Sequence, residues 1–194
     1  MYPRRIIGRN IELKILPATE ENAEKVYHVV QNNKEYLSQF FQRLVSAFDS
    51  KKQALDILKF DEEQRWLNNS VNYYIFSKNQ LIGEIAADWA GQNSSASIIY
   101  WLDKSHVGKG YMSQALKMME KNLFLNGYSE ARLYIDAANW RSANVAKYNY
   151  YQLSDDGNYY FKTRKMYNNP RQPICRKKDY VGRFCRLFRV RNRQ

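Results

Sequence analysis

Three segments rich in β-forming residues follow one another at 71–77, 80–89 and 96–102, with only short connections between them. The dipeptide Lys78-Asn79 between the first two predicts a tight hairpin. Strands joined by such short connections pair antiparallel, because a parallel pair needs a long crossover. The chain is therefore expected to build a mainly antiparallel sheet, and an all-helical fold is excluded.

Helix and strand patterns flank this block of strands on both sides. Before it we predict a strand at 11–16 and helices at 19–32, 35–41 and 51–67. After it we predict an amphipathic helix from Met112 to Gly127, a strand at 131–137, a helix at 142–150 and a strand at 158–166. This order predicts an α+β layered fold with a mixed, mostly antiparallel central sheet and helices on both faces.

Positive charge is concentrated at the C-terminus. The net charge is +12, but residues 168–194 hold nine of the 31 basic residues and one of the 19 acidic ones. Periodicity is lost after the Asn168-Asn169-Pro170 break, so we expect one domain over residues 1–167 and a basic tail at 168–194, disordered or weakly helical.

The cysteines and the hydropathy pattern bear on the compartment. Both cysteines, Cys175 and Cys185, lie in the tail, so the body has no disulfide framework and no metal-ligand spacing. The sequence shows no signal peptide and no apolar stretch long enough to span a bilayer. These features predict a soluble, cytoplasmic protein without a metal; monomer and homodimer both remain open.

A strand, a glycine loop and a helix start succeed one another at residues 100–113. Gly108 and Gly110 let the backbone approach a ligand, and the free N–H groups of a first helical turn favour an anion. A pyrophosphate suits this arrangement, although a simple tight turn explains the two glycines equally well. The loop lacks the spacing of a P-loop and of a dinucleotide-binding fingerprint.

A second segment begins with Asn139-Trp140-Arg141-Ser142 and continues to Tyr151. Taken alone, Asn139 is a loop residue and Ser142 is a helix N-cap, and neither needs a chemical role.

Together, the two segments resemble the GNAT superfamily of N-acetyltransferases, and the similarity covers about residues 10–167. In that family the loop before the long helix follows the pattern [Gln/Arg]-x-x-Gly-x-[Gly/Ala], and here it reads Val107-Gly108-Lys109-Gly110-Tyr111-Met112. The variant Gly-Lys-Gly-Tyr-Met-Ser and the Asn-x-x-Ser-x-x-Val-Ala run from Asn139 look like the ribosomal-protein-alanine N-acetyltransferase branch (RimJ/RimL type).

The resemblance implies roles for particular residues. Backbone groups of Tyr100, Trp101 and Leu102 would pair with the pantetheine arm of acetyl-CoA, and Asn139 would bond the pantetheine or the acyl region. The pyrophosphate would be held by the amides of Val107, Gly108, Lys109, Gly110, Tyr111, Met112 and Ser113.

Three positions depart from the family pattern. Val107 stands in place of Gln or Arg, and Tyr150 stands where a glycine precedes the aromatic residue, which would strain the turn. Ala146 occupies the position of a tyrosine that protonates the leaving thiolate in many members. Because of these departures, an enzyme of lower activity remains an alternative.

The implied reaction is direct attack of a primary amine on the acetyl thioester. An α-amine, with a pKa near 7.7–8.0, loses its proton far more easily than a lysine amine. This difference favours a protein N-terminus as acceptor. Glu84 is the candidate base, although a carboxylate that merely faces solvent from a strand explains it equally well. Ser142 is the candidate proton donor to the thiolate. His106 is predicted to be a solvated loop residue without a partner.

Two other functions remain open. A small-molecule amine such as a polyamine or aminoglycoside would need an acidic pocket, for which Asp61-Glu62-Glu63 is a candidate, although a solvated helix face explains that run too. Alternatively, a weakly active member of the family would bind RNA or ribosomes through the tail with Phe184 and Phe188, unless the tail has no function.

Overall fold

The computed structural model describes residues 2–89 and 94–169, so the predictions for residues 170–194, including both cysteines, lie outside the described part. Eight strands form one sheet: β1 (Arg5–Ile7), β2 (Glu12–Lys14), β3 (Ser70–Ser77), β4 (Gln80–Asp88), β5 (Ser95–Leu102), β6 (Glu130–Leu133), β7 (Gln152–Leu153) and β8 (Tyr160–Thr163). The helices are α1 (Glu20–Asn32), α2 (Lys34–Ser38), α3 (Gln42–Ala47), α4 (Lys51–Trp66), the 3₁₀ turn η1 (Lys104–His106), α5 (Tyr111–Leu125), α6 (Trp140–Tyr148) and α7 (Arg164–Asn168).

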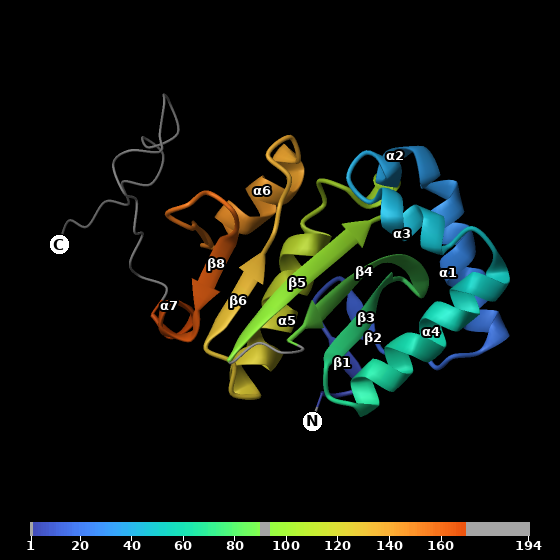
Figure 1. Ribbon diagram of the computed structural model, residues 1–194, viewed down its shortest axis with the longest axis horizontal. Coiled ribbons are helices and arrows are strands. Elements are labelled where there is room, and N and C mark those ends of the chain that lie inside the picture. Colours follow the sequence, from blue (N-terminus) through green and yellow to red (C-terminus); the bar gives the residue numbers. More distant parts are fainter. Residues whose placement is uncertain (1, 90–93, 170–194) are drawn as a thin grey trace.

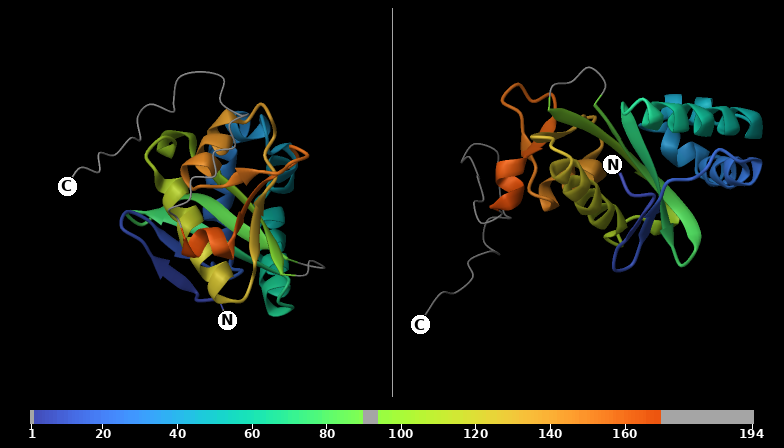
Figure 2. Two further views of the ribbon diagram at one scale, coloured as in Figure 1. Left: turned by 90° about the vertical axis from the view of Figure 1, so that its left-hand side faces the viewer. Right: turned by 90° about the horizontal axis from the view of Figure 1, so that it is seen from below.

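The strand order in the sheet is β1-β2-β3-β4-β5-β6-β8-β7, and every pair is antiparallel except β5 with β6. Helices α1 to α4 cover one face, and α5 and α6 cover the other (Figures 1 and 2). The mixed, mostly antiparallel fold with helices on both faces is confirmed.

The core has two layers, one on each face of the sheet. Alternate residues of one strand enter different layers: Tyr73 and Ile75 pack with α5 and α6, whereas Tyr74 and Phe76 pack with α1 to α4. This alternation is the period of two that strand geometry requires. Both faces of β3 and β4 are buried, which explains why their sequences are mostly apolar, with Asn72 and Glu84 among the exceptions.

The hairpin between β3 and β4 is confirmed. Lys78 and Asn79 both have positive φ, 48° and 65°. Two consecutive left-handed residues form the two-residue turn whose twist matches the strands.

Several predicted boundaries were wrong. The strand expected at 131–137 ends at Leu133, and the strand expected at 158–166 ends at Thr163, which caps α7 by accepting a hydrogen bond from the Met166 amide. Strands β1 and β7 and helix α3 were not predicted, because each is at most six residues long and shows no clear period. Short elements take their conformation from tertiary contacts.

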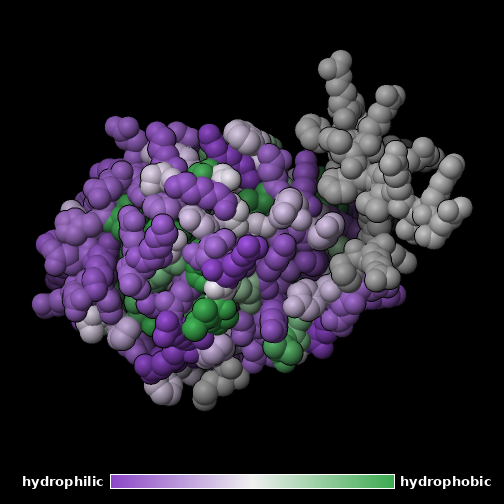
Figure 3. All heavy atoms as spheres, turned by 180° about the vertical axis from the view of Figure 1, so that it is seen from behind, coloured by the Kyte–Doolittle hydropathy of each residue, from purple (hydrophilic) through white to green (hydrophobic). Residues whose placement is uncertain are grey.

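The face of the molecule seen in Figure 3 is mainly hydrophilic, with apolar side chains scattered over it. No helix within residues 2–89 and 94–169 combines the length and the apolar character of a membrane span.

Candidate active site

Strands β5 and β6 separate after a short paired stretch. Their parallel ladder joins only Ser95 with Glu130, Ala96 with Ala131 and Ser97 with Arg132. Beyond Ser97, β5 continues to Leu102 with β4 on one side only (Figure 1). The splay between the two strands leaves backbone groups of β5 free to pair with an extended ligand.

A pocket of about 70 Å³ lies in this splay. Tyr100 of β5 and Leu133 of β6 line it, with Asn139 and Ser142 from the start of α6. Phe40 and Phe41, from the connection between α2 and α3, form its wall on the opposite face of the sheet. The pocket therefore passes through the sheet, with α6 at one end and the α2–α3 connection at the other.

The loop between β5 and α5 is the candidate anion site. Gly108 and Gly110 have φ of 79° and 78°, and Gly110 is the N-cap of α5. A Cβ at either glycine would meet no atom within 4 Å, so the backbone conformation, not lack of space, calls for glycine.

Six successive N–H groups of this loop, from Gly108 to Ser113, have no hydrogen-bond acceptor among the described residues. Unpaired N–H groups at a helix N-terminus carry partial positive charge and bind phosphates. Lys109, between the two glycines, is exposed and adds a full positive charge. The predicted pyrophosphate loop thus has free N–H groups from Gly108 to Ser113. The Val107 N–H is not free, because it donates to the Lys104 carbonyl at 3.4 Å.

Side chains in the first turn of α5 serve the fold. Met112 is buried in the core, and the Ser113 hydroxyl donates to the Asn149 amide oxygen at 3.1 Å. Tyr111 is half-buried, with its ring centroid 6.0 Å from that of His106. Met112 and Ser113 therefore offer only their main-chain amides to a ligand.

Asn139 and Ser142 occupy adjacent turns at the start of α6. Asn139 is the N-cap, and its side-chain oxygen accepts the Ser142 N–H at 3.1 Å. The prediction that Ser142 is the N-cap was wrong. Helix α6 begins at Trp140, so Asn139 is its N-cap, and Ser142 lies within the first turn. Half-buried Ser142 lines the pocket, and its side chain is hydrogen-bonded to the Tyr100 hydroxyl.

The structure does not bring Glu84 into this pocket. Glu84 is buried, and its carboxylate accepts hydrogen bonds from the Trp101 indole at 2.8 Å and from Asn72 at 3.0 Å. Burial raises the pKa of Glu84, and these two bonds oppose the rise. Trp101, predicted to contact pantetheine, faces the layer under α1 to α4, so only its backbone adjoins the splay.

A second carboxylate lies close to Glu84. Asp61 lines a separate cavity of about 20 Å³ with Asn72 and Tyr74, and also with Arg4 and Arg65. Burial, and secondarily the Glu84 charge, raise the pKa of Asp61 to about 8. Asp61 is therefore not part of a solvated helix face, and Glu62 lines the same cavity, where Arg4 and Arg65 balance the two carboxylates.

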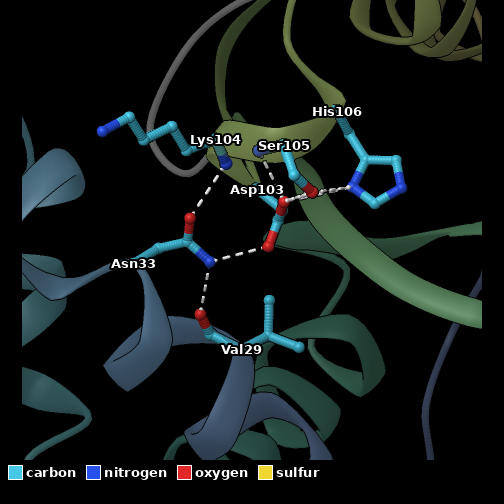
Figure 4. Close-up of polar contacts among 6 residues, drawn as sticks. All are labelled: Val29, Asn33, Asp103, Lys104, Ser105 and His106. Atoms are coloured by element: carbon cyan, nitrogen blue, oxygen red, sulfur yellow. Dashed lines mark hydrogen bonds and ion pairs between the residues drawn. The ribbon is translucent and has the colours of Figure 1, made fainter.

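A hydrogen-bonded cluster follows β5 and was missed by sequence reasoning (Figure 4). Asp103 accepts hydrogen bonds from Asn33 at 2.8 Å and from the Ser105 amide at 2.8 Å, and His106 Nδ1 lies 3.1 Å from it. The prediction that His106 is solvated and partnerless was wrong, since its side chain is only 15% exposed. An aspartate followed two residues later by serine is a signal for the local turn, but nothing in the sequence points to Asn33.

The structure locates the remaining departures from the family pattern. Ala146 is fully buried in the core beneath α6, so this position offers no proton donor. Tyr150 is in the left-handed region with φ of 64°, which is the strain predicted for a residue in the place of glycine. Among the described residues, no three His, Cys, Asp or Glu side chains gather as a metal site.

Residues 12–149 match the family model of the acetyltransferase (GNAT) domain, which covers more than half of the chain. The chain belongs to the GNAT acetyltransferase family, as the motifs indicated.

Particular relatives narrow the comparison. The ribosomal-protein-serine acetyltransferase of Escherichia coli K12 is 29% identical over 111 residues, which span 55% of this chain and 60% of that protein. Among solved structures, RimL, a ribosomal L7/L12 alpha-N-protein acetyltransferase in complex with coenzyme A, superposes with a TM-score of 0.70 at 22% identity, over 81% of this chain and 96% of that one. The microcin C7 self-immunity acetyltransferase MccE, in complex with acetyl-CoA and AMP, also gives 0.70 at 18% identity, over 84% and 97%. At such identities the structural matches show the fold alone.

Proposed function

We propose that this protein transfers an acetyl group from acetyl-CoA to the N-terminal α-amine of a protein, as a ribosomal-type N-acetyltransferase. The observation that carries the proposal is the continuity between the splay of β5 and β6 and the open N-terminus of α5. The splay accepts an extended arm, and the helix start accepts the diphosphate at its end.

Acetyl-CoA fits this arrangement group by group. The pyrophosphate takes the free amides of Gly108 to Ser113, and the pantetheine arm runs along the unpaired edge of β5 at Tyr100, Trp101 and Leu102. Asn139, at the rim of the pocket, is placed to bond the arm near the thioester. The thioester then lies in the pocket between Tyr100 and the start of α6.

The chemical step needs little from side chains. The neutral amine attacks the acetyl carbonyl, the C–S bond breaks as the tetrahedral adduct collapses, and the thiolate takes a proton. Ser142 relays that proton, receiving in exchange the one that the nitrogen loses, so no net charge builds up. A main-chain amide near Leu102 would stabilise the oxyanion.

Glu84 has an indirect place in this scheme. Its carboxylate is bonded to the Trp101 indole and does not line the pocket. To act as a base, Glu84 would need a chain of water molecules that leads past Trp101 to the amine. An α-amine is partly neutral at pH 7–8 without a strong base. Glu84 and Ser142 thus remain proposed catalytic groups, and their E84Q and S142A variants separate the two roles.

Support for a protein acceptor comes from the site and from the relatives' names. Among the described residues that line the pocket, Asp136 is the single carboxylate, and it accepts the Ala138 N–H at 2.8 Å, while aromatic side chains form the opposite wall. A polyamine or aminoglycoside needs several carboxylates. The E. coli relative and RimL are named for ribosomal proteins, whereas MccE, with AMP bound, keeps a small-molecule acceptor as the second candidate.

Residues 1–167 are proposed to be sufficient for catalysis. The basic segment 168–194 is proposed to add affinity for ribosomal RNA near the acceptor, which places the protein in the cytoplasm. Truncation after residue 167 should leave acetyl transfer to peptides unchanged and remove salt-dependent RNA binding. RNA binding that survives this truncation would contradict the assignment to the tail.

Calorimetric titration with acetyl-CoA, CoA and ATP tests the coenzyme, with the G110A variant as the negative control. Binding of the first two alone is expected; saturable ATP binding or no CoA binding would overturn the proposal. A panel of free-N-terminal peptides, N-blocked lysine peptides, spermidine and kanamycin, with detection of released thiol, then identifies the acceptor. Faster turnover of an amine other than a peptide N-terminus would refute the ribosomal type.

A further inference from the structure

Asn33 makes unusual use of its side chain. It lies between α1 and α2, is 5% exposed, and occupies the N-cap position of α2. An N-cap asparagine normally bonds the amides of its own helix, but Asn33 makes no such bond. Its amide nitrogen donates to the Val29 carbonyl and to the Asp103 carboxylate, both at 2.8 Å, and its oxygen accepts the Lys104 N–H at 2.9 Å.

Asp103 is the fixed end of this contact. It directly follows β5, and its N–H bonds the Ile82 carbonyl at 2.7 Å. The carboxylate also accepts the Ser105 amide and hydroxyl and faces His106 Nδ1 (Figure 4). Asp103 therefore fixes the turn that leads into the loop from Val107 to Ser113, called the coenzyme loop below. Asn33 contacts this turn from another part of the chain.

The Asn33–Asp103 contact joins the segment that carries one wall of the pocket to the segment that leads to the glycine loop. From Asn33, the chain runs through α2 to Phe40 and Phe41, which form the wall opposite α6. From Asp103, it runs through η1 to Gly110 and the free amides of α5. One buried side chain thus sets the position of the aromatic wall relative to the coenzyme loop.

We propose that Asn33 and Asp103 form a latch. Asn33 is then a positioning residue that holds the wall of Phe40 and Phe41, where the acceptor would approach, against the coenzyme loop. This inference rests on the proposed function, because it concerns the approach of the amine to the thioester. Loss of Asn33 removes its bond to the Lys104 N–H but leaves the contacts of Asp103 with Ser105 and His106, so the loop that follows keeps its shape. Coenzyme binding is then preserved, while the wall that guides the acceptor moves.

The test separates the two substrates kinetically. N33A should lower kcat/KM for the acceptor peptide at least tenfold, while the Kd for acetyl-CoA changes less than threefold. N32A, at the exposed neighbouring asparagine, is the matched control and should stay within twofold of wild type in both. Equal losses in coenzyme affinity and acceptor turnover, or acceptor kinetics for N33A within twofold of N32A, would overturn the latch.

An exchange of the two side-chain types provides the rescue. N33D sets two carboxylates against each other and should lose more activity than N33A. N33D/D103N restores an amide-to-carboxylate bond and should recover acceptor kcat/KM at least fivefold over N33D. A double variant no better than N33D would contradict the proposal even where N33A folds poorly.

A ligand-free measurement keeps the latch separate from the proposed function. Hydrogen–deuterium exchange of N33A, with no coenzyme present, should be faster than wild type in residues 34–48 and unchanged in residues 112–125. Uniform exchange over both segments would remove the latch. Failure of the wild-type chain to bind acetyl-CoA would refute the enzyme and leave this readout intact.

Discussion

The hydroxyl of Tyr100 donates a hydrogen bond to the main-chain carbonyl of Ser142 at 3.2 Å. This bond spans the open end of the splay, from β5 to the first turn of α6. Tyr100 is 7% exposed, and burial raises the pKa of its hydroxyl, so the group stays protonated and remains a donor. The width of the pocket between β5 and α6 depends on this contact.

Removing that hydroxyl should therefore affect both stability and coenzyme binding. Y100F leaves the Ser142 carbonyl without its partner and should cost about 1 kcal/mol of unfolding free energy. Because α6 can then shift away from β5, the Kd for acetyl-CoA should rise about threefold to tenfold. Urea denaturation and calorimetry measure the two effects.

Tyr73 offers a matched control for this variant. It is fully buried on the same face of the sheet, and its hydroxyl donates to the Pro3 carbonyl at 2.7 Å, away from the pocket. Y73F should lose similar stability without a change in coenzyme affinity. If Y73F weakens acetyl-CoA binding as much as Y100F does, the bond to Ser142 has no special role.

The glycine at the start of α5 should be required for its backbone angle. A side chain at Gly110 has open space but must adopt φ of 78°, which costs roughly 1–2 kcal/mol. Relaxation of that strain would turn the free amides away from the diphosphate. G110A should therefore weaken CoA binding at least tenfold by calorimetry.

Gly157 separates strain from binding. It has φ of 76°, also faces open space, and lies in the turn between β7 and β8. G157A should lower the melting temperature about as much as G110A while leaving CoA affinity unchanged. Equal CoA affinities for the two variants would argue against the anion site.

Tyr150 should be improvable by glycine. Its side chain is 61% exposed, yet its backbone has φ of 64°. Y150G relieves the left-handed strain and should raise the unfolding free energy by about 1 kcal/mol. Y150A removes the same ring but keeps the strain, so thermal denaturation should show no gain for it. A gain in Y150A equal to that in Y150G would assign the effect to the ring.

The larger part of the fold was predictable because periodicity records burial. The strands β3 to β5 and helices α1, α4 and α5 each bury a regular set of positions, so their patterns were visible. The sequence also located the loop of the candidate anion site, since Gly108 and Gly110 stand between a strand and a helix. It could not place Glu84, because a strand carboxylate looks the same whether it faces solvent or an indole.

Contacts between distant segments could not be predicted from the sequence, because local patterns carry no sign of them. Asn33 and Asp103 are 70 residues apart, and neither residue type is unusual in its local setting. The same holds for Asp61, whose acidic neighbours Glu62 and Glu63 suggested a solvated face. Only the packing of α4 against β3 and β4 brings Asp61 near Glu84.

The buried carboxylates Asp61 and Glu84 should make stability depend on pH. Both pKa values are raised in the folded state, so near neutral pH the native pair keeps a proton that the unfolded chain has released. The native state then binds more protons, and the unfolding free energy falls as pH rises from about 4 to about 8. The slope should approach 1.4 kcal/mol per pH unit.

D61N removes one of the two carboxylates and should flatten this slope between pH 5 and 8 in urea denaturation. D56N, at an exposed position of the same helix, is the control and should retain the wild-type slope. Parallel pH profiles for wild type and D61N would show that the pair is not responsible.

The ion pair of Lys162 with Glu120 should be intolerant of single changes. The two groups meet at 2.7 Å with side chains 8% and 0% exposed, and Lys162 also donates to the Asn149 carbonyl at 2.9 Å. K162M leaves a buried carboxylate alone and should cost about 3–5 kcal/mol in denaturant titrations. E120L/K162M should recover most of that loss; a double variant as unstable as K162M would point to packing instead of charge.

The short ladder between β5 and β6 has a mechanical consequence. Within the described residues, three residue pairs join the C-terminal strands to the rest of the sheet, so the ladder at this seam is short. A cosubstrate arm in this gap, as we propose, would supply hydrogen bonds to β5 and act as a temporary strand. Loaded protein should therefore unfold as one cooperative unit, whereas empty protein is free to open along the seam through which the cosubstrate enters.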